Sequence, residues 1–415
     1  MITRSLYVVA ISLAGLNLCP AASGDTITVC LSGCDFSDLW PAIQSAQEGD
    51  IIEVDDSKVW ESNGCQNFDP NNPCSDPFTD FNITIRGSVD DNGRPSTKIY
   101  KSIYNLTTNV VFENIQFGVD FSSEGFAFQI EGCDPSYTNC VFYNSNILRP
   151  ANADDSPASI VIAGASPLFT DCEFRSVEGI SDSNMGRSVI SILVGNQSGS
   201  EIPSSPTLTN CRFIDCKASD TGVIFCRSGG TFLNCVFESN FTGSAVFYVR
   251  DNRELLIKGC SFIGNFGSLV GCAIYLSSSS NDVTIESCQF NKNYTVGRGG
   301  AIYSAGAYPE IKDCTFTGNL AENGGGAIFC TSGGLNLTNC EFSSNFPDSI
   351  TGPFSTTPPV SLIGDVNGDG IVDHLDVVAL NQQIGICQSD LNGDGLVNGE
   401  DLTAMLAQWG ISCAP

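Results

Sequence analysis

The chain has 415 residues, and its 46 acidic and 18 basic side chains give a formal net charge of −28. This charge excludes nucleic acids and anionic membranes as partners, because both would repel the protein. Beyond residue 23 no run reaches the 18 or more apolar residues of a membrane helix, so no transmembrane segment is predicted.

Residues 1–23 have the layout of a secretory signal peptide. Arg4 precedes an apolar run from Leu6 to Leu18, and small residues follow Pro20 up to Ser23. We therefore expect an exported protein, secreted or held at the cell surface. Of the twenty cysteines, Cys19 lies in this peptide, so nineteen remain and at least one thiol stays unpaired.

The next region is a repeat. The pattern Cys-x-Phe occurs eight times between residues 110 and 345, and Ile115-Gln-Phe117 is a ninth copy with Ile in the cysteine place. Later copies are 24 to 28 residues apart, and longer steps of 32 and 39 residues precede Cys172 and Cys211. This period suits one coil of a solenoid. The copies are Cys140-Val-Phe142, Cys172-Glu-Phe174, Cys211-Arg-Phe213, Cys235-Val-Phe237, Cys260-Ser-Phe262, Cys288-Gln-Phe290, Cys314-Thr-Phe316 and Cys340-Glu-Phe342.

Each copy predicts a short strand whose Cys and Phe face the interior while the middle residue faces water. An Asn follows three residues after the Phe, and we expect it to form a corner in the left-handed conformation. A second strand follows, with Gly at its turn and a small Ala in the narrow interior. The asparagines are Asn240, Asn265, Asn293, Asn319 and Asn345, and the second strands include 271–275, 299–303 and 325–329.

These repeats resemble right-handed parallel β-helix proteins of the pectin-lyase-like type, and they look like the repeats of chlamydial polymorphic outer-membrane proteins. The resemblance spans most of residues 25–345. Residues 36–54 look like the capping helix and first strand of such folds, and residues 83–87 like an early coil. The expected fold of residues 24–346 is therefore an all-β right-handed parallel β-helix solenoid of about ten coils with an N-terminal cap.

The cysteine line is expected to consist of buried thiols. One cysteine per coil does not make the tetrahedron that zinc needs, and no Cys-x-x-Cys occurs. Some cross-coil disulfides are compatible with the spacing of neighbouring coils. Local pairing is favoured for Cys30 with Cys34, for Cys65 with Cys74, and for Cys133 with Cys140.

Catalysis on the rod has limited support in the sequence. The only histidine, His374, lies in the C-terminal region, which excludes imidazole chemistry on the rod. The charged run 250–254 is the densest cluster that a lyase could use, although a solvated turn is the favoured interpretation. Insertions at about 144–166 and 176–206 are expected to overhang the rod, where they could wall a groove. Acids available for a glycosidase pair are Asp154, Asp155, Asp215 and Asp220.

Residues 347–362 are rich in Pro, Ser and Thr and are predicted to be a semi-stiff linker between separate domains.

The last region, residues 363–415, contains a duplicated calcium-binding loop. Each copy places oxygen-bearing side chains at loop positions 1, 3, 5, 9 and 12, the carbonyl of position 7 completes the set, and Gly occupies position 6. Ca²⁺ is therefore the predicted cofactor, with one ion per loop. The ligands are Asp365, Asn367, Asp369, Ile371, Asp373 and Asp376 in the first loop and Asp390, Asn392, Asp394, Leu396, Asn398 and Asp401 in the second.

Each loop runs into a short helix with an apolar stripe, and Cys387 and Cys413 could clip the two halves together. The repeat resembles the type I dockerin family over residues 363–413, including Asp at position 12 of each loop. This resemblance implies a cohesin-type partner on a scaffold or cell surface. His374-Leu375 and Gly399-Glu400 differ between the copies, so two interchangeable binding faces are not supported. The alternative is a calcium-rigidified tail without a partner.

Together these features predict an exported, calcium-binding, dockerin-bearing β-helix. It would be a surface-associated binding or structural module in assemblies that bind or degrade polysaccharides, with a polysaccharide as a possible ligand of the rod. The alternative is a polysaccharide lyase or glycoside hydrolase whose active site lies on a β-helix face.

Overall fold

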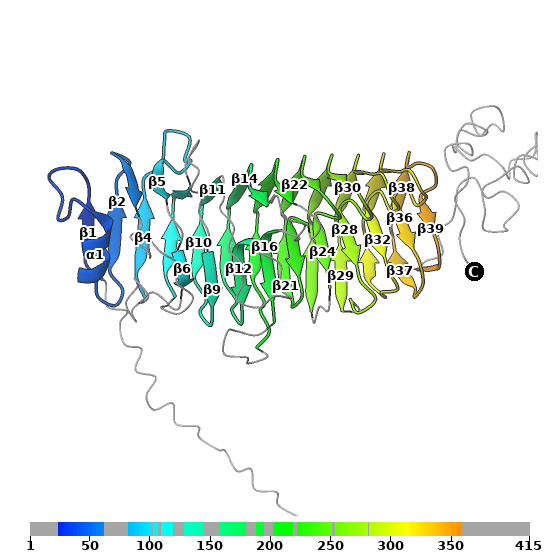
Figure 1. Cartoon of the computed structure of the whole chain (residues 1–415), viewed down its shortest axis with the longest axis horizontal. Helices are drawn as coiled ribbons and strands as arrows, with labels where there is room; N and C mark the ends of the chain where they lie inside the picture. Colours follow the sequence, from blue (N-terminus) through cyan, green and yellow to red (C-terminus); the bar gives the residue numbers. More distant parts are fainter. Residues whose placement is uncertain are drawn as a thin grey trace, which may run out of the picture.

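The computed structural model describes residues 24–61, 82–100, 103–106, 109–118, 128–143, 158–179, 188–194, 202–218, 222–250, 254–280 and 282–357. This part of the chain is an elongated parallel β-solenoid (Figure 1). Each full coil passes through four sheets in turn, which we number 1 to 4. The prediction of an all-β parallel solenoid is confirmed.

Sheets 1 and 2 contain the longest rows of strands, and all of their neighbouring strands are parallel. Sheet 1 has thirteen strands: β1 Thr26–Val29, β2 Ile51–Val54, β4 Thr84–Gly87, β7 Val111–Glu113, β10 Ser136–Thr138, β13 Leu168–Thr170, β17 Thr207–Thr209, β21 Gly230–Leu233, β25 Leu255–Lys258, β29 Val283–Glu286, β33 Glu310–Lys312, β37 Leu335–Thr338 and β40 Phe354–Thr357. Sheet 2 has eleven: β3 Val59–Glu61, β5 Thr97–Tyr100, β8 Ile115–Phe117, β11 Val141–Tyr143, β14 Glu173–Arg175, β18 Arg212–Ile214, β22 Val236–Glu238, β26 Ser261–Ile263, β30 Gln289–Asn291, β34 Thr315–Thr317 and β38 Glu341–Ser343.

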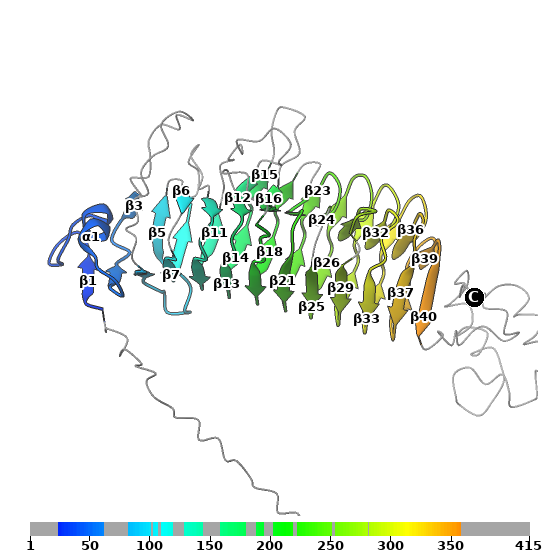
Figure 2. The same cartoon turned by 90° about the horizontal axis from the view of Figure 1, so that it is seen from below.

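Sheets 3 and 4 complete the coils (Figure 2). Sheet 3 has six two-residue strands: β15 Glu178–Gly179, β19 Lys217–Ala218, β23 Phe241–Thr242, β27 Phe266–Gly267, β31 Tyr294–Thr295 and β35 Leu320–Ala321. Sheet 4 has ten strands: β6 Ile103–Leu106, β9 Phe128–Glu131, β12 Ala158–Ala163, β16 Ser188–Leu193, β20 Ile224–Cys226, β24 Phe247–Val249, β28 Ile274–Leu276, β32 Ile302–Ser304, β36 Ile328–Cys330 and β39 Ile350–Thr351.

The interior of sheet 2 carries an unbroken ladder of phenylalanine rings. The Phe of every Cys-x-Phe copy, and Phe117 before them, stacks on its neighbours in the adjacent coils with ring centroids 4.4 to 5.2 Å apart. All of these rings except Phe342 in the last copy are at most 1 % exposed. Burying each side chain contributes about 2 kcal/mol, so the ladder is a main source of stability.

The corner geometry differs from the prediction. The left-handed residue is the one before the Asn that recurs in each coil, for example Ser239 (φ 56°) before Asn240 and Lys292 (φ 54°) before Asn293. A second left-handed residue precedes the cysteine of each copy, for example Asn139 (φ 49°) before Cys140. The Asn after the corner turns inward instead, because only there can its amide reach the neighbouring coils.

The five predicted asparagines form a ladder of amides along the rod. Asn293 Nδ2 donates to Asn319 Oδ1 at 3.0 Å and to the Phe262 carbonyl at 2.9 Å, while Asn293 Oδ1 accepts from the backbone N–H of Asn265 at 3.2 Å. The same links run from Asn240 through to Asn345. Each buried amide therefore satisfies backbone groups of two coils.

A helix closes the N-terminal end. Helix α1 (Leu39–Ser45) buries Leu39, Ala42 and Ile43 against the first coils, which confirms the predicted cap. Strand β1 precedes it, so the strand at 51–54 is the second of sheet 1 and not the first. The expected Cys30–Cys34 disulfide is formed, with Cα atoms 5.6 Å apart.

Two expectations from the sequence need correction, one on where the rod ends and one on the insertions. The solenoid continues through β39 and β40 to Thr357, although the rod was expected to end at residue 346 and a linker to begin at 347. The expected overhanging insertions contain β12, β15 and β16, which pair within sheets 3 and 4. Within the described ranges, no helix combines the length and the apolar composition that crossing a membrane requires.

Candidate functional site

Most of the residues singled out in the sequence lie outside the described residues. These are the twelve calcium ligands between Asp365 and Asp401, the acids Asp154, Asp155 and Asp220, the centre of the run 250–254, and the cysteine pairs 65–74 and 387–413. Asp215 is described, and it occupies a left-handed corner (φ 53°) directly after β18. Of the four acids named for a glycosidase pair, Asp215 is the one that lies within the described residues. The charge clusters of the described rod come from other residues.

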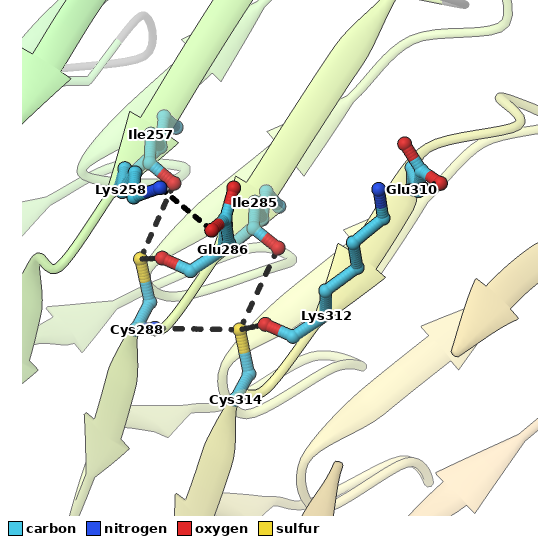
Figure 3. Close-up of polar contacts among 8 residues, drawn as sticks. All are labelled: Ile257, Lys258, Ile285, Glu286, Cys288, Glu310, Lys312 and Cys314. Carbon is cyan, nitrogen blue, oxygen red and sulfur yellow. Dashed lines mark hydrogen bonds and ion pairs between the residues drawn. The ribbon is translucent and has the colours of Figure 1, made fainter. Parts of the chain in front are cut away.

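One charge cluster lies on the outer face of sheet 1 (Figure 3). Lys258 Nζ is 2.7 Å from Glu286 Oε1 in the next coil, and Lys312 Nζ is 2.8 Å from Glu310 Oε1. The hydrogen bond that Lys312 donates to Glu310 raises the pKa of Lys312, and the charge of Glu286 adds to the effect. A catalytic base for a lyase needs the opposite shift, because the amine must lose its proton near neutral pH. This cluster therefore fits structural ion pairs.

Directly beneath it run the cysteines (Figure 3). Cys288 Sγ donates to the Ile257 carbonyl at 3.4 Å, Cys314 Sγ donates to the Ile285 carbonyl at 3.6 Å, and the Cys288 N–H donates to Cys314 Sγ at 3.4 Å. The eight repeat cysteines are buried thiols, as predicted. Cys140 is one of them, so the suggested Cys133–Cys140 disulfide is wrong; its Sγ bonds to the Phe112 and Thr138 carbonyls instead.

A second charge cluster lies on the outer face of sheet 2. Arg175 Nε is 2.6 Å from Glu173 Oε1, and Arg212 lies between Glu173 and Glu238 at 3.7 Å from each carboxylate. The hydrogen bond that Arg175 donates to Glu173 raises the pKa of Arg175. Two acids near each other can form a glycosidase pair, but here Glu173 and Glu238 are both in ion-pair contact with Arg212.

Sequence reasoning missed this second cluster because its members are 39 and 26 residues apart in the chain. Glu173 and Arg212 each occupy the middle position of a Cys-x-Phe copy, and the structure pairs them directly in register. An alignment of the Cys-x-Phe copies, coil by coil, would have placed Glu173 and Arg212 side by side.

A third polar region lies at the N-terminal cap. A hollow of about 380 Å³ is lined by Thr28, Val29, Cys30, Cys34, Glu53, Val54, Asp55, Arg86, Gly87 and Ser88. Arg86 is its only basic group, and it is bound by Glu113 at 2.6 Å and by Glu53 at 3.6 Å. The hydrogen bond that Arg86 donates to Glu113 raises the pKa of Arg86. The cation of this hollow is thus already neutralised by protein carboxylates.

Sheet 1 carries a hydroxyl-rich surface on its outer face, between the hollow at Arg86 and the charge cluster of Lys258 and Glu286. Its outward residues are aligned in two rows by the parallel register of β10, β13, β17 and β21. The rows consist of Ser136, Leu168, Thr207 and Thr231, and of Thr138, Thr170, Thr209 and Leu233. Six of the eight side chains offer a hydroxyl, which both donates and accepts hydrogen bonds.

The outer face of sheet 4 carries stacked aromatic rings. Tyr248, Tyr275, Tyr303 and Phe329 follow one another with centroids 4.5, 5.6 and 5.6 Å apart, and Arg298 lies 4.8 Å over the Phe329 ring. At β12, β16 and β20 the same face is apolar and buried, with Val161, Leu193 and Phe225 in one cluster. The ring faces of this row are covered by their neighbours, so it presents ring edges and hydroxyls.

Residues 160–342 match the family model described as the right-handed beta helix region. No curated protein matches the chain. Solved structures with a weak overall similarity to this chain include the surface protein and adhesin PfbA of Streptococcus pneumoniae (12% identity, TM-score 0.38, 74% of this chain and 88% of that one). Others are the GH136 lacto-N-biosidase of Eubacterium ramulus (10%, TM-score 0.35, 80% and 67%) and the Agl-KA catalytic domain (13%, TM-score 0.27, 76% and 63%). These low values carry no information about function.

Proposed function

We propose that this protein is an exported β-helix rod that binds polysaccharide and is attached to a partner through a calcium-loaded dockerin module. The observation that carries the binding role is the chemistry of the rod's outer faces. The charge clusters of the described residues are closed ion pairs, whereas the hydroxyl rows of sheet 1 have hydrogen-bonding groups to offer. A surface of this kind suits a hydroxyl-rich, uncharged ligand better than it suits catalysis.

The experiment is to incubate the purified protein with a panel of polysaccharides in calcium, measuring both binding and the release of reducing sugar or unsaturated uronate. We expect binding without release. Replacing Thr207, Thr209 and Thr231 with Ala should weaken binding and leave the fold intact. A wild-type protein that binds no polysaccharide of the panel contradicts the proposal.

The alternative, a polysaccharide lyase or glycoside hydrolase, is favoured by one observation: Glu173, Arg212 and Glu238 converge on one sheet face. If the panel yields product, the variant Glu173→Gln separates the two functions. Its matched control is Glu341→Gln, because Glu341 occupies the middle place of the last Cys-x-Phe copy on the same sheet. Product release that is lost in Glu173→Gln and kept in Glu341→Gln establishes the enzyme.

For the C-terminal module, calcium binding is proposed from the oxygen ligands that the two loops supply. Carboxylate, amide and carbonyl oxygens at this loop spacing are the ligands that calcium prefers. The residues from Asp365 to Asp376 and from Asp390 to Asp401 would each hold one ion, and the bound ions would supply much of the folding free energy of so short a segment. Partner binding is tested with an immobilised cohesin domain: we expect retention of the full chain in calcium and release by chelator. If the protein binds calcium but no cohesin retains it, the module is a calcium-rigidified tail without a partner.

A further inference from the structure

From β23 onward, the outer face of sheet 3 carries one large apolar side chain per coil, whereas Glu178 of β15 and Lys217 of β19 occupy this register position in the two preceding strands. Parallel register aligns Phe241, Phe266, Tyr294 and Leu320, and a bridge from Leu320 adds Phe346 in the last coil. Phe241 is 49 %, Leu320 37 % and Phe346 63 % exposed. We call these five residues the apolar row; its first strand, β23, lies near the upper edge of the rod in Figure 2.

The apolar row is flanked by further exposed aliphatic residues. Leu269 follows β27 and is 56 % exposed, and Val296 follows β31 and is 38 % exposed. Of the ten large apolar side chains exposed on the described residues, five therefore lie on this one edge. A soluble protein rarely leaves such residues grouped on its surface unless they contact a ligand or partner.

The rings of the row are arranged in two ways. Phe241 and Phe266 stack with centroids 4.8 Å apart and planes 8° apart, whereas Tyr294 is turned by 63° relative to Phe266. Phe241 and Phe266 therefore present ring edges at one end of the row. The Tyr294 ring, in the middle of the row, is inclined to them and presents part of its face. The Tyr294 hydroxyl is bonded to Glu322, and Asn323 Nδ2 donates to the Val296 carbonyl at 2.8 Å. Polar side chains thus border the apolar surface.

The shape of the row selects the kind of ligand. It is roughly 20 Å long at about 4.8 Å per coil and one side chain wide, which is far below the area of about 800 Å² per partner that a stable protein interface needs. An extended peptide is also a poor fit. Peptides add to open sheet edges, whereas β23, β27 and β31 are each paired on both sides. The ligand is therefore long, narrow and independent of backbone pairing.

We propose that the apolar row is the docking line for a neutral polysaccharide chain lying along the rod axis. The C–H faces of its sugar rings would pack on Phe241, Phe266 and Tyr294, while its hydroxyls would meet the polar border. An uncharged polymer is not repelled by a net charge of −28, whereas an anionic one is. This inference rests on the proposed binding function and adds to the hydroxyl rows of sheet 1 a second contact surface on sheet 3.

The test compares two double variants of the full chain in pull-down assays with microcrystalline cellulose, using polygalacturonate as the anionic comparison. Phe241→Ser with Leu269→Ser removes two members of the exposed edge. The matched control is Leu31→Ser with Tyr308→Ser, because these side chains are 57 % and 59 % exposed and lie outside both the apolar row and the hydroxyl rows. We expect about tenfold weaker binding to cellulose in the first variant, no change in the control, and little binding of any form to polygalacturonate.

Single replacement Phe241→Tyr keeps the ring, so it should restore binding to within about twofold of wild type if the aromatic surface matters. Unchanged thermal unfolding of the variants shows that they are folded. If wild type and the Phe241→Ser, Leu269→Ser variant bind cellulose equally, the apolar row is not the docking line, although the proposed binding function still stands. If wild-type protein binds neither cellulose nor any other polysaccharide of the panel, both proposals fail.

Discussion

At the scale of single residues, the two corners of each coil solve the same hydrogen-bonding problem with different side chains. After one left-handed residue, Asn293 Nδ2 donates to the Phe262 carbonyl; after the other, Cys288 Sγ donates to the Ile257 carbonyl. Both acceptors lie in the preceding coil. The Asn293 and Cys288 N–H groups in turn donate to the equivalent side chain of the following coil. Cysteine thus acts as the smaller and weaker counterpart of asparagine.

Replacing Asn293 with Ala should be costly because it removes the centre of the amide ladder. The Phe262 carbonyl and the Asn265 backbone N–H then lose this partner in a buried place, and Asn319 Oδ1 and Asn265 Nδ2 each lose one hydrogen bond, so we expect a loss of about 3 kcal/mol in the free energy of unfolding. Urea unfolding of the full chain measures it. Asn336→Ala is the control, since Asn336 is exposed, and a loss as large there would contradict the role of the ladder.

Buried thiols away from the main line give the rod a pH-dependent stability. Burial raises the pKa of Cys216 and of Cys226 to about 12 from an ordinary value of 9.0. Because the folded pKa is the higher one, the stabilisation is complete below pH 9 and is lost as the pH rises towards 12. Each thiol should lower the free energy of unfolding by about 1.4 kcal/mol per pH unit in this window.

The measurement is urea unfolding at several pH values from 8 to 10.5. A Cys216→Ala, Cys226→Ala variant should show a shallower decline than wild type above pH 9, whatever its stability at pH 8. Parallel declines would mean that these thiols titrate normally.

At the scale of elements, the repeat explains the strands better than it explains their surfaces. Alternation in Cys-x-Phe correctly placed Phe174 and Cys172 in the core, because burial selects those residues directly. The left-handed corners were misplaced by one residue, since a polar side chain fits both a corner and an inward amide ladder. Ile350 and Phe354 were assigned to a linker because the last coil lacks the motif, and their pairing depends on the preceding coil alone.

The phenylalanine ladder should be cooperative between coils. Phe213 lies between Phe174 at 4.4 Å and Phe237 at 4.8 Å, so its replacement with Ala leaves a cavity that both neighbours border. We expect a loss of about 4 kcal/mol in the free energy of unfolding. Hydrogen exchange should show faster opening of β14, β18 and β22 and smaller effects further along the rod. Uniform acceleration over all coils would contradict this local coupling.

At the scale of the whole molecule, the same repeat that stabilises the rod also determines what its surface can offer. Parallel register copies each outward position at every coil, so rows of like side chains arise on each sheet: hydroxyls on sheet 1, and aromatic rings on sheets 3 and 4. Neighbouring charges in such rows are complementary at Lys258 with Glu286 and at Glu173 with Arg212, because like charges at coil spacing would repel. A linear polymer is the ligand whose periodicity such a surface can match.

The rod and the calcium loops should respond independently to metal. Among the described residues no group of acidic, His or Cys side chains is arranged to hold an ion, so chelation should leave the main unfolding transition of the rod unchanged. Titration calorimetry of the full chain should give two calcium ions per molecule. Asp369→Ala and Asp394→Ala should each reduce this number to one, because each removes a carboxylate from one loop. A rod transition that shifts with calcium, or a stoichiometry that neither variant changes, would place the calcium sites elsewhere in the chain.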